Sequence, residues 1–105
     1  MPDQTKQINF TIVPGEDPEG APALRTYSNF CSIAHTPFDF TLTFCDMQPL
    51  TEREVQSAQS TGIVKAPVRS RMVVPVQMIP GLISALQENF RLYQESFGPP
   101  KGALH

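Results

Sequence analysis

The residues best suited to nucleophilic or acid–base chemistry fall within one stretch of this sequence. They are two thiols, one imidazole and two carboxylates: Cys31, His35, Asp39, Cys45 and Asp46. A thiol acts as a nucleophile when a base lies within hydrogen-bond reach. In the predicted strand Cys31 and His35 share a face, but about 13–14 Å separates them along it. We therefore expect two free, reduced thiols that pack as small apolar side chains, and no catalytic residue.

Neither a metal site nor a cofactor site is predicted. A metal centre needs three or four converging ligands, but the second histidine is the terminal His105 and no ligand pair is closely spaced. The glycines are scattered, and none is followed by the Lys-Ser or Lys-Thr pair of a phosphate-binding loop. We therefore expect no cofactor and no enzymatic activity.

Three basic residues occur on one face of a predicted strand, an arrangement that suits contact with phosphates. Lys65, Arg69 and Arg71 are spaced for this role. No aromatic side chain is interleaved with them, as a single-strand stacking platform requires. We interpret them as a solvated face that protects a sheet edge, and nucleic acid is not the favoured partner.

Three further residues are candidates for contact with a protein partner. Tyr27 and Asn29 form a Tyr-x-Asn pair that is able to orient a peptide, although a tyrosine where a helix crosses a sheet more often has a structural role. His35 precedes Thr36-Pro37, so we expect it to be a turn residue bonded to the backbone. The candidate partner-binding set is therefore Tyr27, Asn29, His35, Lys65, Arg69 and Arg71.

Composition indicates one folded domain. The chain has 105 residues, of which 40% are hydrophobic and 17% charged, with a net charge of -2, so wholesale disorder is excluded. No apolar run approaches the roughly 20 residues of a membrane span, and the start lacks a basic and then apolar leader. We expect a soluble cytoplasmic protein with a single domain over 1–105. Its core covers about 7–98, its loops are 14–24 and 48–63, and its flexible tail is 99–105.

Hydrophobic alternation predicts four strands, at about 7–13, 25–35, 38–45 and 64–74. Thr36-Pro37 joins the second and third as an antiparallel hairpin. The segment between the third and fourth strands is polar, so we expect a mobile flap with at most one helical turn from the capping box of Thr51 and Glu54.

A helix is predicted over residues 77–97, because large apolar residues recur there at spacings of three and four. Gly98 is placed to end it. The fold class is α+β: a four-stranded, mainly antiparallel meander with one long C-terminal helix packed on it. The residues predicted to form the core or an oligomer contact are Phe38, Phe40, Leu42, Phe44, Leu82, Leu86, Phe90, Tyr93 and Phe97.

Several segments share a pattern with a known group of proteins. They are a Tyr-x-Asn strand from Tyr27, a His-x-x-x-Asp-Phe hairpin from His35, the late strand at 69–74 and a Leu-x-Glu-Asn helix from Leu86. Together they resemble a family of bacterial and archaeal proteins of roughly 100 residues, known only as a domain of unknown function. Many such proteins begin the last helix with acidic and lysine residues, whereas this chain has an apolar start at 75–81. The resemblance implies relatives but no activity.

Apolar residues occur at both parities in two of the predicted strands, and one helix covers only part of one sheet face. The remaining apolar surface predicts a homo-oligomer, at its simplest a two-fold dimer. We therefore expect a non-catalytic interaction or adaptor module. One alternative is a chaperone that holds unfolded polypeptide, because a meander followed by a long helix resembles the export chaperone SecB. The other is a weak nucleic-acid binder that uses the basic strand face.

Overall fold

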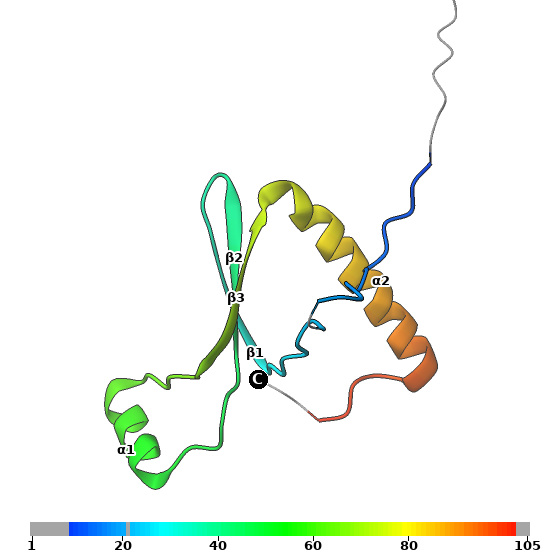
Figure 1. The fold of residues 1–105 in the computed structure, drawn as a ribbon. Coiled ribbons are helices and arrows are strands. Elements are labelled where there is room, and N and C mark those ends of the chain that lie inside the picture. The colour runs from blue at the N-terminus through cyan, green and yellow to red at the C-terminus, as the bar shows by residue number, and fades with distance from the viewer. Residues whose placement is uncertain (1–8, 21, 103–105) are drawn as a thin grey trace, which may run out of the picture.

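The computed structural model describes residues 9–20 and 22–102, and these residues form an α+β fold (Figure 1). The strands are β1 (Phe30–His35), β2 (Asp39–Cys45) and β3 (Val68–Pro75). Helix α1 (Glu52–Thr61) lies between β2 and β3. A single 3-10 turn, η1 (Val76–Met78), leads from β3 into the long helix α2 (Ile79–Phe97). The predicted antiparallel sheet and long C-terminal helix are confirmed.

The sheet is an antiparallel meander in the order β1-β2-β3. The β1–β2 hairpin is closed by Thr36, whose N–H donates to the Asp39 carbonyl at 2.9 Å. The Thr36 hydroxyl accepts from the N–H groups of Phe38 and Asp39 and lies 3.0 Å from the Asp39 carboxylate. Pro37 presets one backbone angle of this turn. The hairpin predicted from the sequence is therefore confirmed.

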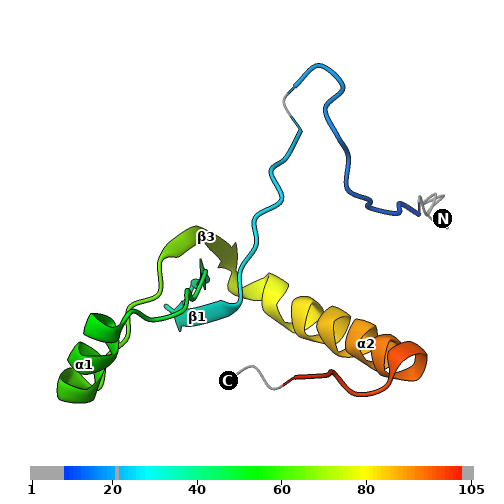
Figure 2. The same cartoon turned by 90° about the horizontal axis from the view of Figure 1, so that it is seen from below.

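The sheet has three strands and not four, because the strand predicted at about 7–13 is absent from the residues that the structure describes. Residues 9–13 lie in no sheet, and Phe10 and Ile12 are 81% and 95% exposed. Gln7 and Ile8, the first residues of the predicted strand, lie outside the described part. An alternating pattern forms a strand only where a sheet edge pairs its backbone, and the chain before β1 runs away from the sheet (Figure 2).

Helix α1 replaces the predicted mobile flap. It has ten residues, although none of them is buried. The predicted capping box is present, because the Glu54 N–H donates to the Thr51 hydroxyl at 3.2 Å and the Thr51 N–H donates to the Glu54 carboxylate at 3.0 Å. Gly62 ends the helix at a φ of 73°, a left-handed conformation that favours glycine. Both ends are thus closed by local hydrogen bonds.

Helix α2 begins two residues later than predicted and ends where the sequence placed its end. Pro80 lies in its first turn, where its missing N–H costs no helical hydrogen bond. Gly98 has a φ of 77°, and its N–H donates to the Gln94 carbonyl at 2.8 Å.

The predicted packing of this helix on its own sheet is not observed. Among the described elements, α2 makes substantial contact only with η1, and it runs away from the end of β3 (Figures 1 and 2). Within the described chain, Cys45 and Val74 are the only buried apolar residues. Phe40, Leu42, Phe44 and Leu82 are half-buried. The other predicted core residues are exposed: Phe38, Leu86, Phe90, Tyr93 and Phe97.

Candidate interaction surface

The strand register gathers apolar side chains on one side of the sheet. Ile33 pairs with Leu42, which pairs with Met72, so the three side chains form one row across the strands. Ile33 is 61% exposed and Met72 is 53% exposed. Because side chains alternate along a strand, the rows two residues away on either side lie on the same face. This apolar sheet face consists of Cys31, Ile33, His35, Phe40, Leu42, Phe44, Ser70, Met72 and Val74.

A second apolar surface runs along α2. Three of its aromatic rings follow one another, with 6.4 Å between the ring centroids of Phe90 and Tyr93 and 5.1 Å between those of Tyr93 and Phe97. Leu86 is 63% exposed and Phe97 is 71% exposed. At 3.6 residues per turn these side chains share one side of the helix. This helix stripe consists of Ile79, Leu82, Ile83, Leu86, Phe90, Tyr93 and Phe97.

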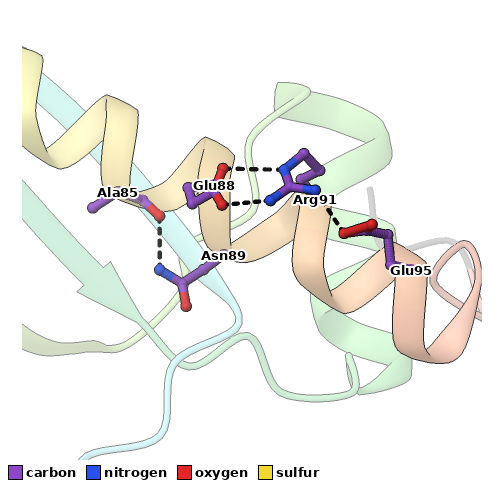
Figure 3. A network of polar contacts seen from close by, with 5 residues as sticks. All are labelled: Ala85, Glu88, Asn89, Arg91 and Glu95. Atoms are coloured by element: carbon purple, nitrogen blue, oxygen red, sulfur yellow. Dashed lines mark hydrogen bonds and ion pairs between the residues drawn. The ribbon is translucent and has the colours of Figure 1, made fainter.

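Helix α2 carries two sets of polar contacts between its own residues, one around Arg91 and one at Asn89 (Figure 3). At 3.6 residues per turn, Glu88, Arg91 and Glu95 lie on the side away from the helix stripe. Arg91 forms ion pairs with Glu88 and Glu95, each at 2.6 Å. The hydrogen bonds from Arg91 lower the pKa of Glu88. The pKa of Arg91 is raised, mainly by its hydrogen bonds to Glu88 and also by the one to Glu95. Asn89 donates to the Ala85 carbonyl at 2.9 Å. These polar groups find partners within the helix, whereas most of the helix stripe is left exposed by the described residues.

The structure gives Asn29 a structural role and leaves Tyr27 exposed. The Asn29 side chain accepts from the Met47 N–H at 2.7 Å and donates to the Met47 carbonyl at 3.1 Å, which ties the start of β1 to the end of β2. Tyr27 is 67% exposed. The two residues of the predicted Tyr-x-Asn pair thus differ in their contacts within the chain, and their role with a partner stays a prediction.

His35 lies at the opposite end of β1 from Asn29. Its ring stacks on Phe40, with 5.3 Å between the centroids. The side-chain hydrogen bonds of the turn come from Thr36 rather than from His35, so the predicted role of His35 as a turn residue bonded to the backbone is wrong. His35 instead extends the apolar sheet face.

The three basic candidates do not form a regular row on β3. Phe44 pairs with Ser70 and Cys45 pairs with Val68, which leaves Arg69 as the extra residue of a β-bulge. The bulge interrupts the alternation on which the predicted row of Lys65, Arg69 and Arg71 depends. Lys65 precedes β3 and lines a hollow on the surface together with Glu54. None of the three forms an ion pair with another described residue.

One feature that sequence reasoning missed is a hollow of about 480 Å³ where the three strands meet their connecting loops. Its lining is mainly apolar, and Phe30 brings it to the start of β1. The sequence signal was weak, because isolated apolar residues in two separate loops show no period. The lining residues are Asn29, Phe30, Met47, Gln48, Pro49, Val64 and Ala66.

The thiols do not meet each other or a base. Cys31 pairs with Phe44, and Cys45 pairs with Phe30, so the two cysteine side chains lie on opposite faces of the sheet. Cys31 is exposed and Cys45 is buried. In residues 9–20 and 22–102, no group of three His, Cys, Asp or Glu side chains is placed to hold a metal ion. No helix in this part of the chain has the length and apolarity that crossing a membrane requires.

Comparison with known proteins gives a family and nothing closer. Residues 2–101 match the model of a family described as "Protein of unknown function (DUF3467)". Neither a curated protein nor a solved structure matches the chain.

Proposed function

The chain belongs to the DUF3467 family, whose function is unknown, and we propose that it is a non-catalytic interaction module that works as a homodimer. The observation that carries this proposal is the exposure of two extensive apolar surfaces in one small chain. Most of the helix stripe is exposed, and the apolar sheet face is exposed or half-buried except at Val74. The described chain buries only two apolar side chains. Such surfaces are typical of subunits that complete their core on assembly.

The apolar burial within one chain is small compared with the conformational entropy that folding costs. Full burial of a large apolar side chain contributes roughly 1.5–3 kcal/mol, and conformational entropy opposes folding at about 1–2 kcal/mol for every ordered residue. A chain of 105 residues cannot offset that cost with Cys45 and Val74 alone. A second copy supplies the missing contacts, because a two-fold dimer buries the same surfaces on both subunits.

The non-catalytic part of the proposal is supported by the positions of the chemically able groups. The two thiols lie on opposite faces of the sheet, and the His35 ring stacks on Phe40. The Asp39 carboxylate is engaged by the Thr36 hydroxyl in the hairpin turn. No nucleophile is therefore paired with a base in this part of the molecule.

The test is the mass of the protein in solution, measured by light scattering and by sedimentation at several concentrations. We expect a dimer. Leu86→Glu places a charge in the helix stripe, so it should weaken dimerisation at least about 100-fold, the scale of an interface hot spot. Leu92→Glu is the same substitution on the side of α2 that faces away from the stripe, and it should leave the dimer intact. A folded, cooperatively melting monomer for the unaltered chain would contradict the proposal.

A second candidate function rests on the hollow beside β1. Its apolar lining and the unpaired outer edge of β1 suit an extended, apolar peptide, as a chaperone that holds unfolded polypeptide requires. The protein should then slow the aggregation of chemically reduced, unfolding lysozyme. Val64→Asp in the hollow should abolish this effect, whereas Ile63→Asp, whose side chain does not line it, should retain it. Equal protection by both variants would rule out the hollow as the binding site.

A further inference from the structure

We infer that the dimer forms by helix exchange, in which α2 of each copy lies across the apolar sheet face of the other. This inference rests on the proposed homodimer and adds which surfaces meet. The occupant of the apolar sheet face is thus the helix stripe of a second copy.

The connection between β3 and α2 holds the helix away from its own sheet. It consists of the three residues of η1, with Pro75 at one end and Pro80 in the first turn of α2. The Val76 N–H donates to the Phe38 carbonyl at 3.1 Å, and the Ile79 N–H donates to the Val76 carbonyl. These bonds and the fixed φ angles of the prolines set the direction of α2. A helix that folds back on its own sheet needs a flexible reversal, which this connection lacks.

The two surfaces match in length and in kind. A helix of 19 residues is about 28 Å long at 1.5 Å per residue. A strand of seven residues such as β2 is about 23–24 Å long at 3.3–3.4 Å per residue. The stripe presents aromatic rings, and the sheet face presents Phe40, Leu42 and Phe44, so both sides of the contact are apolar.

The available area is sufficient for a stable dimer. Five side chains of the helix stripe are 41–71% exposed, so at about 150–250 Å² for a large side chain they leave roughly 500 Å² to be covered. On the sheet face Ile33 and Met72 are 61% and 53% exposed, and together with its other exposed and half-buried members they leave roughly 300–400 Å². Stable complexes bury about 800 Å² on each partner. Helix exchange uses both surfaces of each copy and reaches this value, whereas a contact of stripe with stripe, or of sheet with sheet, uses only one and leaves the other in water.

The polar side of α2 is consistent with this placement. Arg91, Glu88 and Glu95 lie on the side of the helix that faces away from the stripe, and more than half of each side chain is exposed. When the stripe is covered, these charges stay in water with their partners. Helix exchange therefore leaves these three charged groups in water and avoids the cost of desolvating them.

Crosslinking tests which surfaces meet, because Cys31 is a natural reporter on the apolar sheet face and is exposed in the single chain. One preparation keeps Cys31, and a second carries Cys31→Ser with Ile83→Cys on the helix stripe. The two are mixed, unfolded, refolded together and treated with a short bis-maleimide. We expect crosslinks between the two kinds of chain, and their loss when Ser84→Cys, on the side of α2 that faces away from the helix stripe, replaces Ile83→Cys.

Each other outcome has a defined meaning. Crosslinks of Cys31 to Cys31 in the unaltered dimer would show that the sheets meet, and crosslinks between two copies of the Ile83→Cys chain would show that the helices meet. Either result overturns helix exchange, as does a dimer with no crosslink at all. A monomeric unaltered protein would instead overturn the proposed homodimer.

Lengthening the connection gives a second, independent test. Insertion of Gly-Ser-Gly-Ser between Met78 and Ile79 frees α2 to fold back on its own sheet. We expect the insertion to convert the dimer into a folded monomer, as in proteins that exchange an element through a short hinge. A dimer of unchanged stability would overturn the inference, because an interface between like surfaces does not depend on this connection.

Discussion

Helices α1 and α2 flank β3 and obtain their stability from different sources. Helix α1 has the Thr51 capping box at its start, and at its end the Gly62 N–H donates to the Ala58 carbonyl at 2.7 Å. Its side chains are mostly short and polar. Helix α2 has no side-chain cap at its start and carries a continuous stripe of large apolar residues. The ends of the first helix are closed by local hydrogen bonds, whereas the second carries an apolar stripe that the described residues leave largely exposed.

Neither helix has a buried residue, but exposure to water has a different consequence for each of them. Exposure of α1 is a stable arrangement, because its hydrogen bonds are closed and few apolar groups face water. Exposure of α2 is an incomplete one, because most helical stability in proteins comes from packing of an apolar face. Substitutions that separate the two sources of stability test the comparison directly.

The largest effect should come from shortening an apolar side chain of α2. Phe90→Ala should lower the free energy of unfolding of the dimer by about 3 kcal/mol for each chain, because it removes an aromatic ring from the proposed interface. Val55→Ala in α1 should cost about 0.5 kcal/mol or less. Urea denaturation at several protein concentrations measures both. Equal, small costs would show that the helix stripe is not buried in solution.

Glycine replacement should have opposite signs in the two helices. Gly62→Ala forces an alanine to a φ of 73° and should destabilise α1 by about 1 kcal/mol, although nothing lies within 4 Å of the added methyl group. Gly81→Ala, in α2, also meets nothing within 4 Å and should stabilise by about 0.5–1 kcal/mol. Hydrogen exchange of the amides in each helix gives the two values. Destabilisation by Gly81→Ala would place that side of α2 in a tight contact.

Acidification should loosen α1 at its start. Hydrogen bonds from the Thr51 backbone and then from its side chain lower the pKa of Glu54 below its usual value of 4.5. Because the folded pKa is the lower one, this stabilisation is complete above the unfolded pKa and is lost as pH falls through the folded pKa. Residue-resolved NMR of the α1 amides should show it. Glu54→Gln retains an acceptor and should abolish the pH dependence, so an unchanged acid transition would contradict this assignment.

The smallest effect should come from the ion pairs of α2. Arg91→Gln removes the contacts to Glu88 and Glu95, which are exposed and therefore strongly screened. We expect no measurable change in dimer mass at physiological salt. A marked loss of dimer would mean that Arg91 contacts the second copy, and the side of α2 assigned to solvent would then be wrong.

Periodicity was sufficient to predict the elements whose stability depends on their own sequence or on nearby strands. The alternation at Phe40, Leu42 and Phe44 predicted β2, and the stripe from Leu82 to Phe97 predicted α2 almost to the residue. The Thr51 capping box predicts the start of α1 but not its length of ten residues. Its length cannot be predicted from apolar periodicity, because α1 depends on its end caps and carries no apolar stripe.

Long-range features could not be predicted in this way. Residues 9–13 have the pattern of a strand, but pairing depends on where the chain before β1 travels, and local sequence does not encode that path. The bulge at Arg69 shifts the alternation of β3, so a row of basic side chains that looks regular in the sequence is broken in space. The packing of α2 depends on the angle set at η1, which follows from the two prolines only once the neighbouring hydrogen bonds are known.

In the proposed homodimer, a subunit whose described residues bury only two apolar side chains has almost no folded state as a separate chain. Its folding then becomes a second-order reaction, and the half-time shortens as more chains are present. In a cell, the amount of folded module would rise more steeply than the rate of synthesis, because unassembled chains are open to proteolysis. The proposed dimer would thus accumulate only when expression of the gene exceeds a threshold level.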